Sequence, residues 1–173
     1  MIGVYNEVVG DVTEPHSASN NKVIVIPHVC NNVGAFGAGV ALSIAKRWPH
    51  VQQKFFDFSK RFPNTDRELL MGMVLFVAAE KTACSTIHIA NMFAQRGLRS
   101  SENKHPLEYT ALTRAMADVV DTCNEMFGRD GFEIHCPKFG TALAGGTWKK
   151  IRPIIDSLWL GYGIDVTVYN FGG

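Results

Sequence analysis

A glycine-rich loop follows the most apolar run of the chain and leads directly into an amphipathic helix. The run begins at Val23, the loop carries Gly34, Gly37 and Gly39, and the helical pattern extends to Arg47. Glycine lets the main chain approach an anion, which the free N–H groups and the dipole of a helix's first turn then hold. No lysine follows Gly39, so the loop predicts phosphate binding without nucleoside triphosphate chemistry. The alternative is a loop whose glycines serve tight packing.

A second segment repeats this order of strand, glycines and helix. A short apolar strand, Phe132–Pro137, precedes Gly140, Gly145 and Gly146, and a helix opens near Thr147. Ligands sit at the carboxyl ends of parallel strands, so two such loops form one cleft if their strands are neighbours. That cleft would fit two phosphates, or a phosphate and a sugar. The alternative is a flexible turn at the glycine pair with Thr147 as the helix cap.

His28 is the best titratable candidate beside the first loop. Because an unperturbed histidine titrates near neutrality, it could orient or deprotonate water, or protonate a leaving oxygen. The competing interpretation is a structural hydrogen-bonding residue at a strand end. Cys30 is a rival nucleophile paired with His28, although strand alternation predicts that Cys30 points into the core.

The cysteine spacing favours neither a zinc site nor disulfides. The four are Cys30, Cys84, Cys123 and Cys136. None has a close cysteine neighbour, so we expect small buried hydrophobic residues, no metal and no cofactor. A site combining His28 and Cys30 with His135 and Cys136 has no accompanying carboxylate.

Length and composition favour one domain spanning residues 1–173, large enough to bury a core. The net charge is +1 and no basic stripe occurs, which disfavours nucleic acid as the main ligand. A basic patch from Arg96 to Lys104 could still attract an anionic ligand. No apolar run reaches membrane-spanning length, and the N-terminus lacks the form of a signal peptide. We therefore expect a cytoplasmic protein without a membrane partner.

Strand and helix patterns alternate along the chain, which predicts an α/β fold with a largely parallel sheet covered on both sides. The strands are expected at Gly3–Val9, Val23–Val29, Met73–Ala78, Ser85–Asn91, Phe132–Pro137 and Asp165–Asn170. The helices are expected at Ala38–Arg47, Val51–Lys60, Leu107–Met126 and Trp148–Leu160.

Four motifs, in this order along the chain, resemble those of the macrodomain family. They are Val9-Gly-Asp-Val-Thr13, His28-Val-Cys-Asn-Asn-Val-Gly-Ala-Phe-Gly-Ala-Gly39, Asn91-Met-Phe-Ala-Gln95 and Gly140-Thr-Ala-Leu-Ala-Gly-Gly-Thr-Trp148. The similarity covers almost the whole chain and is greatest to the branch that includes ADP-ribose-1''-phosphate phosphatases. It implies a three-layer α/β/α fold with a mixed, largely parallel six-stranded sheet.

The resemblance also implies a ligand and the residues that hold it. In the family, an acidic residue at the position of Asp11 accepts a hydrogen bond from the adenine amine, and the next backbone group, at Val12, reads the ring edge. Asn31 stands where the terminal ribose is bound, although it could equally bond the backbone of its own loop. Asn170 lies where the last strand approaches adenine. The two glycine loops enclose the diphosphate and the terminal ribose, through Gly37, Ala38, Gly39, Val40, Gly140, Thr141, Ala142, Leu143, Ala144 and Gly145.

The function that the resemblance favours is removal of phosphate from ADP-ribose 1''-phosphate, with His28 and Asn31 as the catalytic residues. Branches that remove ADP-ribose from macromolecules commonly carry a lysine or an aspartate at positions held here by Gln95 and Ala144, and neither residue can act as a nucleophile or base. Two alternatives stay open: a reader that only binds ADP-ribose or ADP-ribosylated macromolecules, and a hydrolase of acyl or glycosyl ADP-ribose derivatives.

Overall fold

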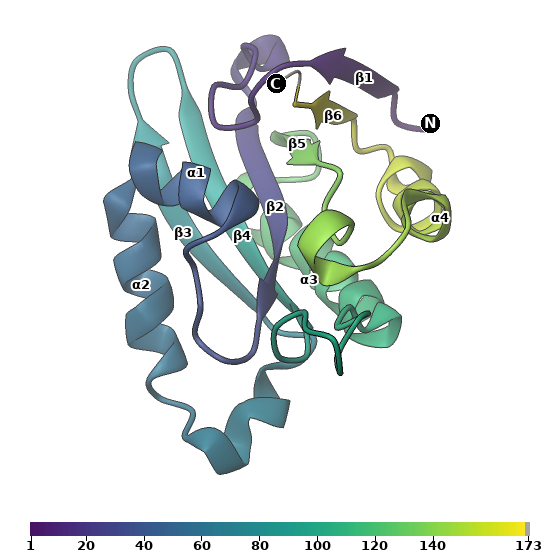
Figure 1. Cartoon of the computed structure of the whole chain (residues 1–173). Coiled ribbons are helices and arrows are strands. Elements are labelled where there is room, and N and C mark those ends of the chain that lie inside the picture. The colour runs from purple at the N-terminus through teal and green to yellow at the C-terminus, as the bar shows by residue number, and fades with distance from the viewer. Residues whose placement is uncertain (172–173) are drawn as a thin grey trace.

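A six-stranded mixed sheet organises the computed structural model, which describes residues 1–171 (Figure 1). The strand order across the sheet is β1-β6-β5-β2-β4-β3, and only β3 runs antiparallel to its neighbour. The strands are β1 (Tyr5–Val9), β2 (Val23–Asn31), β3 (Val74–Lys81), β4 (Thr86–Gln95), β5 (Phe132–Pro137) and β6 (Val166–Asn170). The predicted mixed, largely parallel sheet is confirmed.

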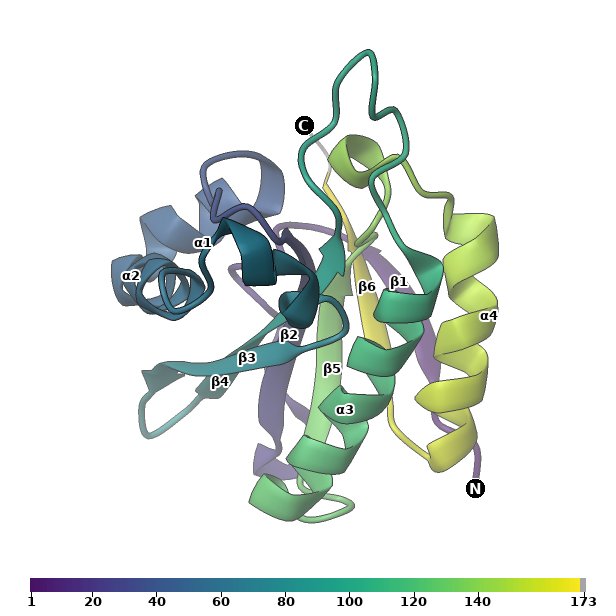
Figure 2. The ribbon, with the colours of Figure 1, turned by 90° about the horizontal axis from the view of Figure 1, so that it is seen from below.

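Four α-helices cover the sheet, α1 and α2 on one face and α3 and α4 on the other (Figure 2). They are α1 (Gly39–Arg47), α2 (Pro49–Ser59), α3 (Tyr109–Phe127) and α4 (Trp148–Leu158). The short 3₁₀ segments are η1 (Ser19–Asn21), η2 (Asn64–Leu70), η3 (Ala142–Ala144) and η4 (Leu160–Tyr162). No helix within residues 1–171 is both long and apolar enough to span a membrane.

Three strands, β2, β3 and β4, continue beyond their predicted ends. The sequence predicts a strand end at Asn91 because asparagine is depleted in strands. Asn91 is instead fully buried, and the pairing of β2 with β4 continues to Asn31 and Gln95 after a register shift at Cys30. The polar groups of Asn91 are satisfied by side-chain hydrogen bonds, so the ladder continues through it.

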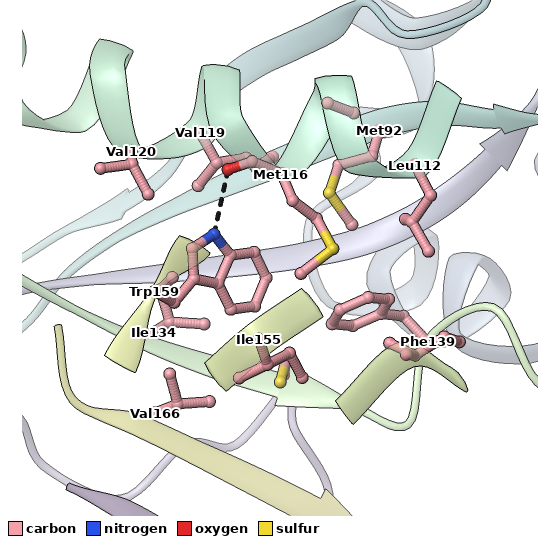
Figure 3. Close-up of a cluster of buried hydrophobic side chains, with 14 of the residues drawn as sticks. Met92, Leu112, Met116, Val119, Val120, Ile134, Phe139, Ile155, Trp159 and Val166 are labelled. Carbon is pink, nitrogen blue, oxygen red and sulfur yellow. Dashed lines mark hydrogen bonds between the residues drawn. The ribbon is translucent and has the colours of Figure 1, made fainter. Parts of the chain in front are cut away.

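The larger hydrophobic core lies between the sheet and helices α3 and α4. Leu112, Met116 and Val119 on one face of α3 are fully buried, as the helical spacing predicts. Trp159, which follows α4, packs against this face and donates from Nε1 to the Met116 carbonyl at 3.0 Å (Figure 3). That bond satisfies the polar atom of a buried indole.

The smaller core lies beneath α1 and α2 and is rich in aromatic side chains. Phe55 stacks on Phe93 of β4 with ring centroids 5.5 Å apart, and Phe36 from the loop after β2 lies against Phe55 at 4.8 Å. The first glycine loop is therefore attached to the core by its phenylalanine. Cys30 is buried here as predicted, but the prediction of burial is wrong for Cys84, which is exposed in the turn between β3 and β4.

The parallel strands all end at the same edge of the sheet. β2 and β5 are parallel neighbours, as the two-loop interpretation requires, and the loops that lead from them to α1 and α4 begin side by side. The 96–106 segment after β4 extends beyond this edge beside the loop from β5 (Figure 2). The topology thus places both glycine loops around one space.

Candidate functional site

A cleft of about 450 Å³ opens between the β2–α1 loop and the β5–α4 loop. The β2–α1 side contributes His28, Val29, Cys30, Asn31, Ala35, Phe36, Gly37, Ala38, Gly39, Val40 and Ala41. The β5–α4 side contributes Pro137, Lys138, Phe139, Gly140, Thr141, Ala142, Leu143 and Ala144, and Gln95, Leu98 and Arg99 line the remaining wall. The structure therefore brings together the residues that the sequence predicted in both loops, except Gly145.

Asn31 shapes the first loop through its side chain. Its Oδ1 accepts hydrogen bonds from the backbone N–H groups of Val33 and Ala35, both at 3.1 Å, and its Nδ2 donates to the Ala35 carbonyl at 2.8 Å. The alternative in which Asn31 bonds its own loop is therefore realised. An amide nitrogen carries two hydrogens, so one N–H of Asn31 is left to donate to a ligand.

The N-terminus of α1 faces the cleft. The helix begins at Gly39, and the preceding Ala38 has no side-chain group that could cap the first turn. Gly39, Val40 and Ala41 line the cleft, so the free N–H groups of the turn lie at its wall. A phosphate oxygen is the partner that such a helix end suits.

The two glycine loops meet across the top of the cleft. Gly39 has φ of +58°, and a Cβ atom there would lie 3.4 Å from Cδ1 of Leu143. A Cβ on Gly37 would have no heavy atom within 4 Å, so Gly37 borders open space. The absence of a side chain at Gly37 therefore keeps room for a ligand, whereas Gly39 serves a left-handed turn and the loop contact.

The second loop is held in a strained conformation. Ala142 has φ of +40°, which is uncommon for a residue with a Cβ atom. Its carbonyl accepts a hydrogen bond from Arg99 at 2.9 Å, which ties the loop to the 96–106 segment. Gly145 does not line the cleft: a Cβ there would lie 2.5 Å from the Lys104 carbonyl. A larger residue at Gly145 would disturb the fold, so it cannot test ligand binding.

The charged groups at the cleft are cationic. Among its lining residues, Arg99 and Lys138 carry positive charge and none carries a carboxylate. Lys138 lies 3.5 Å from Glu7 on β1, and both side chains are partly exposed. The basic patch predicted from Arg96 to Lys104 thus contributes Arg99 to the cleft. Together with the α1 N-terminus, these groups favour an anionic ligand.

A buried hydrogen bond fixes the orientation of His28. The Asn91 Nδ2 group donates to the Leu75 carbonyl at 2.9 Å, which turns Asn91 Oδ1 toward His28. His28 Nε2 lies 2.6 Å from that oxygen and donates to it, leaving Nδ1 as the proton acceptor. His28 is 1% exposed, and its ring lies in a T-shaped arrangement with Phe36, with the centroids 5.5 Å apart.

Burial changes the titration of both groups that the sequence suggested for catalysis. It lowers the pKa of His28 from 6.5 to about 4, against the smaller raising effect of the Asn91 hydrogen bond. The expectation of a histidine that titrates near neutrality is therefore wrong, because the imidazole is uncharged at physiological pH. Burial also raises the pKa of the Cys30 thiol well above its ordinary value, so Cys30 is not a thiolate nucleophile.

The residues predicted to contact adenine lie at the same sheet edge but do not line the cleft. Asp11 follows β1, and its Oδ1 accepts hydrogen bonds from the backbone N–H and hydroxyl of Thr13, at 2.9 and 2.8 Å. Val12 is buried in the smaller core. Asn170 ends β6 and donates to Glu7 at 3.0 Å. Asp11 and Asn170 are close, since the N–H of Gly10 donates to the Asn170 carbonyl.

A buried polar network that the sequence analysis missed anchors the segment after Asp11. His135 lies 2.7 Å from both Glu133 and the Tyr169 hydroxyl, and that hydroxyl accepts the backbone N–H of His16 at 2.9 Å. Glu133 also accepts from the backbone N–H and hydroxyl of Ser19. The sequence does contain a signal for this network. Glu133 and His135 are two residues apart in an apolar strand, so their side chains lie on the same face of it.

The comparisons with known proteins agree with this fold. No protein-family profile matches the chain. Its sequence is 24% identical over 144 residues to an ADP-ribose 1''-phosphate phosphatase from Lodderomyces elongisporus, covering 83% of this chain and 86% of that protein. A solved structure of a protein of unknown function from Bacteroides thetaiotaomicron matches with a TM-score of 0.80 at 28% identity, over 96% of this chain and 98% of that one.

A macrodomain protein from Streptomyces coelicolor is 30% identical to this chain, with a TM-score of 0.76. The match covers 97% of this chain and 99% of the other. Since this identity extends over nearly the full length of both chains, the chain belongs to the macrodomain family.

The depressed pKa of His28 makes the stability of the fold dependent on pH. Above pH 6.5 the imidazole is neutral in both states, whereas between pH 6.5 and about 4 only the unfolded state takes up the proton. We expect this group to lower the free energy of unfolding by about 3 kcal/mol as the pH falls through that range. Urea denaturation at pH 7.5 and pH 4 measures the loss. The loss of stability between these two pH values should be about 3 kcal/mol smaller in His28→Gln than in the wild type. It should be unchanged in the control His50→Gln, because His50 is exposed. An equal loss in all three proteins would contradict the low pKa of His28.

Proposed function

We propose that this chain binds ADP-ribose 1''-phosphate in the cleft and removes its terminal phosphate, giving ADP-ribose and inorganic phosphate. The observation that carries the proposal is the pairing of an open space at Gly37 with a helix N-terminus and two cations. The match to a phosphatase of this name supports the choice of substrate. Its identity of 24% leaves the reaction itself to experiment.

In the proposed complex, the diphosphate lies against the first turn of α1 and the β5–α4 loop. The terminal ribose lies near Asn31, whose remaining N–H donates to a hydroxyl. Adenine extends along the sheet edge toward Asp11 and Asn170. Arg99 and Lys138 border the cleft, where positive charge stabilises the charge that develops on a transferring phosphoryl group.

The proposed chemistry assigns proton transfer to His28 and orientation of the substrate to Asn31. Water attacks phosphorus and its proton passes to the neutral Nδ1 of His28, the bond from phosphorus to the anomeric oxygen breaks, and protonated His28 returns the proton to that oxygen. The products are the ADP-ribose hydroxyl and inorganic phosphate, and His28 is neutral again. Nδ1 is the nitrogen left without a proton by the bond from Nε2 to Asn91. Substrate entry must expose this nitrogen, because Phe36 packs against the ring.

A second candidate function is binding of ADP-ribose without turnover. The enclosure of His28 and the lack of a carboxylate among the cleft-lining residues favour this candidate, since both reduce the supply of a general base. Release of inorganic phosphate from ADP-ribose 1''-phosphate, measured beside calorimetric binding of ADP-ribose, separates the two. Phosphate release supports the enzyme, whereas binding with no release supports the reader.

The first variant tests whether the open space at Gly37 receives the ligand. Gly37→Val adds a side chain where no atom lies within 4 Å, so the fold should be kept and the ligand obstructed. We expect ADP-ribose affinity to fall at least tenfold, roughly 1.4 kcal/mol. Calorimetry checks this, with Ala83→Val in the exposed turn after β3 as the control. Normal affinity in a folded Gly37→Val protein would show that ADP-ribose does not bind beside Gly37 in this cleft.

The second variant tests His28 in the reaction. His28→Ala should lower turnover by roughly 10²–10⁴-fold while the affinity for ADP-ribose changes little, because only proton transfer is lost. With a pKa of about 4, His28 should contribute no titration to the rate between pH 5 and pH 8. Near-normal turnover in the folded variant would show that His28 does not transfer a proton in the reaction. A change of the wild-type rate near pH 6.5 that is absent from His28→Ala would contradict a pKa of about 4 for His28.

The third variant tests whether Asp11 reads adenine. Asp11→Asn keeps Oδ1, which holds Thr13, but replaces the other carboxylate oxygen by an N–H₂ group that opposes the adenine amine. We expect ADP-ribose affinity to fall by about 1–3 kcal/mol without a change in melting temperature. Glu14→Gln, at the exposed neighbouring carboxylate, should bind normally. If Asp11→Asn and Glu14→Gln bind ADP-ribose with equal affinity, adenine does not contact Asp11.

A further inference from the structure

Two cations line the cleft, and the sheet places them toward different ends of it. Lys138 follows β5, and its Nζ lies 3.5 Å from Glu7 on β1, the strand that leads to Asp11. Arg99 comes from the segment after β4, which lies on the other side of β2. Since the strand order is β1-β6-β5-β2-β4-β3, Lys138 is on the side of the predicted adenine contacts and Arg99 is beyond Asn31.

Hydrogen bonds fix the segment that carries Arg99 beside the first loop. Gln95 is opposite Asn31 in the pairing of β2 with β4, and its carbonyl accepts the backbone N–H of Asn32 at 3.0 Å. The Asn32 Oδ1 atom in turn accepts the backbone N–H of Gly97 at 2.9 Å. Arg99 follows two residues later, so the main chain that bears it is attached to the end of β2 next to Asn31.

The same segment is also held by bonds within itself and to the second loop. The Asn103 Nδ2 group donates to the carbonyls of Arg96 and Leu98, at 2.9 and 3.0 Å. The Nδ1 atom of His105 lies 3.0 Å from the Gly145 carbonyl. A loop held by several bonds restricts the positions of a side chain that it carries, which reduces the entropy lost when that side chain binds a ligand.

The Arg99 guanidinium is oriented by one hydrogen bond and has no carboxylate partner. Its Nη1 donates to the Ala142 carbonyl at 2.9 Å. Within residues 1–171 no aspartate or glutamate forms an ion pair with Arg99, and none lines the cleft. Arg96, three residues earlier, differs because Glu68 and Glu108 both pair with it. The other N–H groups of Arg99 are therefore available to an anion in the cleft.

The exposure of Arg99 limits the kind of anion that it binds well. Because the side chain is exposed, attraction between single charges would contribute little. A terminal phosphate monoester carries about −1.5 to −2 charges at neutral pH, and its oxygens match the guanidinium fork in pairs. Each phosphate inside a diphosphate ester carries less charge. Arg99 is therefore better suited to a terminal monoester than to the internal diphosphate.

We propose that Arg99 binds the terminal phosphate of ADP-ribose 1''-phosphate and makes the cleft select this ligand over ADP-ribose. The proposal rests on the function proposed above, which places the terminal ribose at Asn31. Adenine on the β1 side and Arg99 beyond β2 are then at opposite ends of the ligand. The Nε and Nη2 groups of Arg99 donate to two phosphate oxygens while Nη1 keeps its bond to Ala142. Lys138, nearer β1, stabilises the internal diphosphate that both ligands contain.

Calorimetry with both ligands tests the selection. The parent protein is His28→Ala, so that ADP-ribose 1''-phosphate is bound without being hydrolysed. The quantity compared is the ratio of the dissociation constants of ADP-ribose and ADP-ribose 1''-phosphate. We expect the phosphorylated ligand to bind the parent about tenfold more tightly or better, since an arginine–phosphate pair is charge-assisted. Adding Arg99→Gln should remove this preference while the affinity for ADP-ribose changes little.

Two matched variants in the same parent separate Arg99 from charge in general. Lys104→Gln removes one positive charge from the same segment, but Lys104 is exposed and does not line the cleft, so the preference should persist. Lys138→Gln should weaken both ligands alike, because the diphosphate is common to them. Equal weakening of both ligands by Arg99→Gln would show that Arg99 only supports the loop at Ala142. That result, or a parent protein without any preference, would overturn the proposal.

Measurements on the chain with His28 intact distinguish this proposal from the proposed reaction. Arg99→Gln should lower kcat/KM for ADP-ribose 1''-phosphate about tenfold or more, while the inhibition constant of the product ADP-ribose changes little. Turnover with an unchanged ratio of these two constants would overturn the role of Arg99 and leave the reaction supported. If no phosphate is released, calorimetry on this chain gives the same ratio directly. A preference that depends on Arg99 would then support the binding assignment and overturn the reaction.

Discussion

The three hydrogen bonds that the Asn31 side chain makes to its own loop are the interaction on which the cleft depends. They close a turn directly after the central strand β2 and set the course of the chain from there to α1. The first residues of α1, to which the loop leads, line the cleft. Phe36 anchors the far end of the turn in the aromatic core.

Burial keeps the titratable groups at the centre of the cleft uncharged, and the charged groups of the cleft lie at its rim. His28 and Cys30 are close to the loops, but desolvation keeps both uncharged at physiological pH. The positive potential comes instead from the α1 N-terminus, Arg99 and Lys138. This division suits an anionic ligand held by fixed dipoles and partly exposed cations, with a neutral imidazole behind it as proton acceptor.

A second buried network supports the other end of the sheet edge. Glu133, His135 and Tyr169 link β5 and β6 to the segment after β1, through the backbone of His16 and the backbone and hydroxyl of Ser19. A chain of satisfied buried groups is rigid, because breaking one bond leaves its partner unpaired. The position of Asp11, which begins that segment, is thereby coupled to the strands next to the cleft.

The sequence by itself determined the order of strands and helices, the core face of α3 and the two glycine loops, because these follow from local periodicity and from the backbone freedom of glycine. It could not show that β4 continues through Asn91 or that the Asn31 side chain forms hydrogen bonds to its own loop. Nor could it show that Arg99 donates a hydrogen bond to the Ala142 carbonyl. It also could not show that burial lowers the pKa of His28. Desolvation and hydrogen-bond pairing depend on residues distant in sequence, so only the tertiary structure decided them.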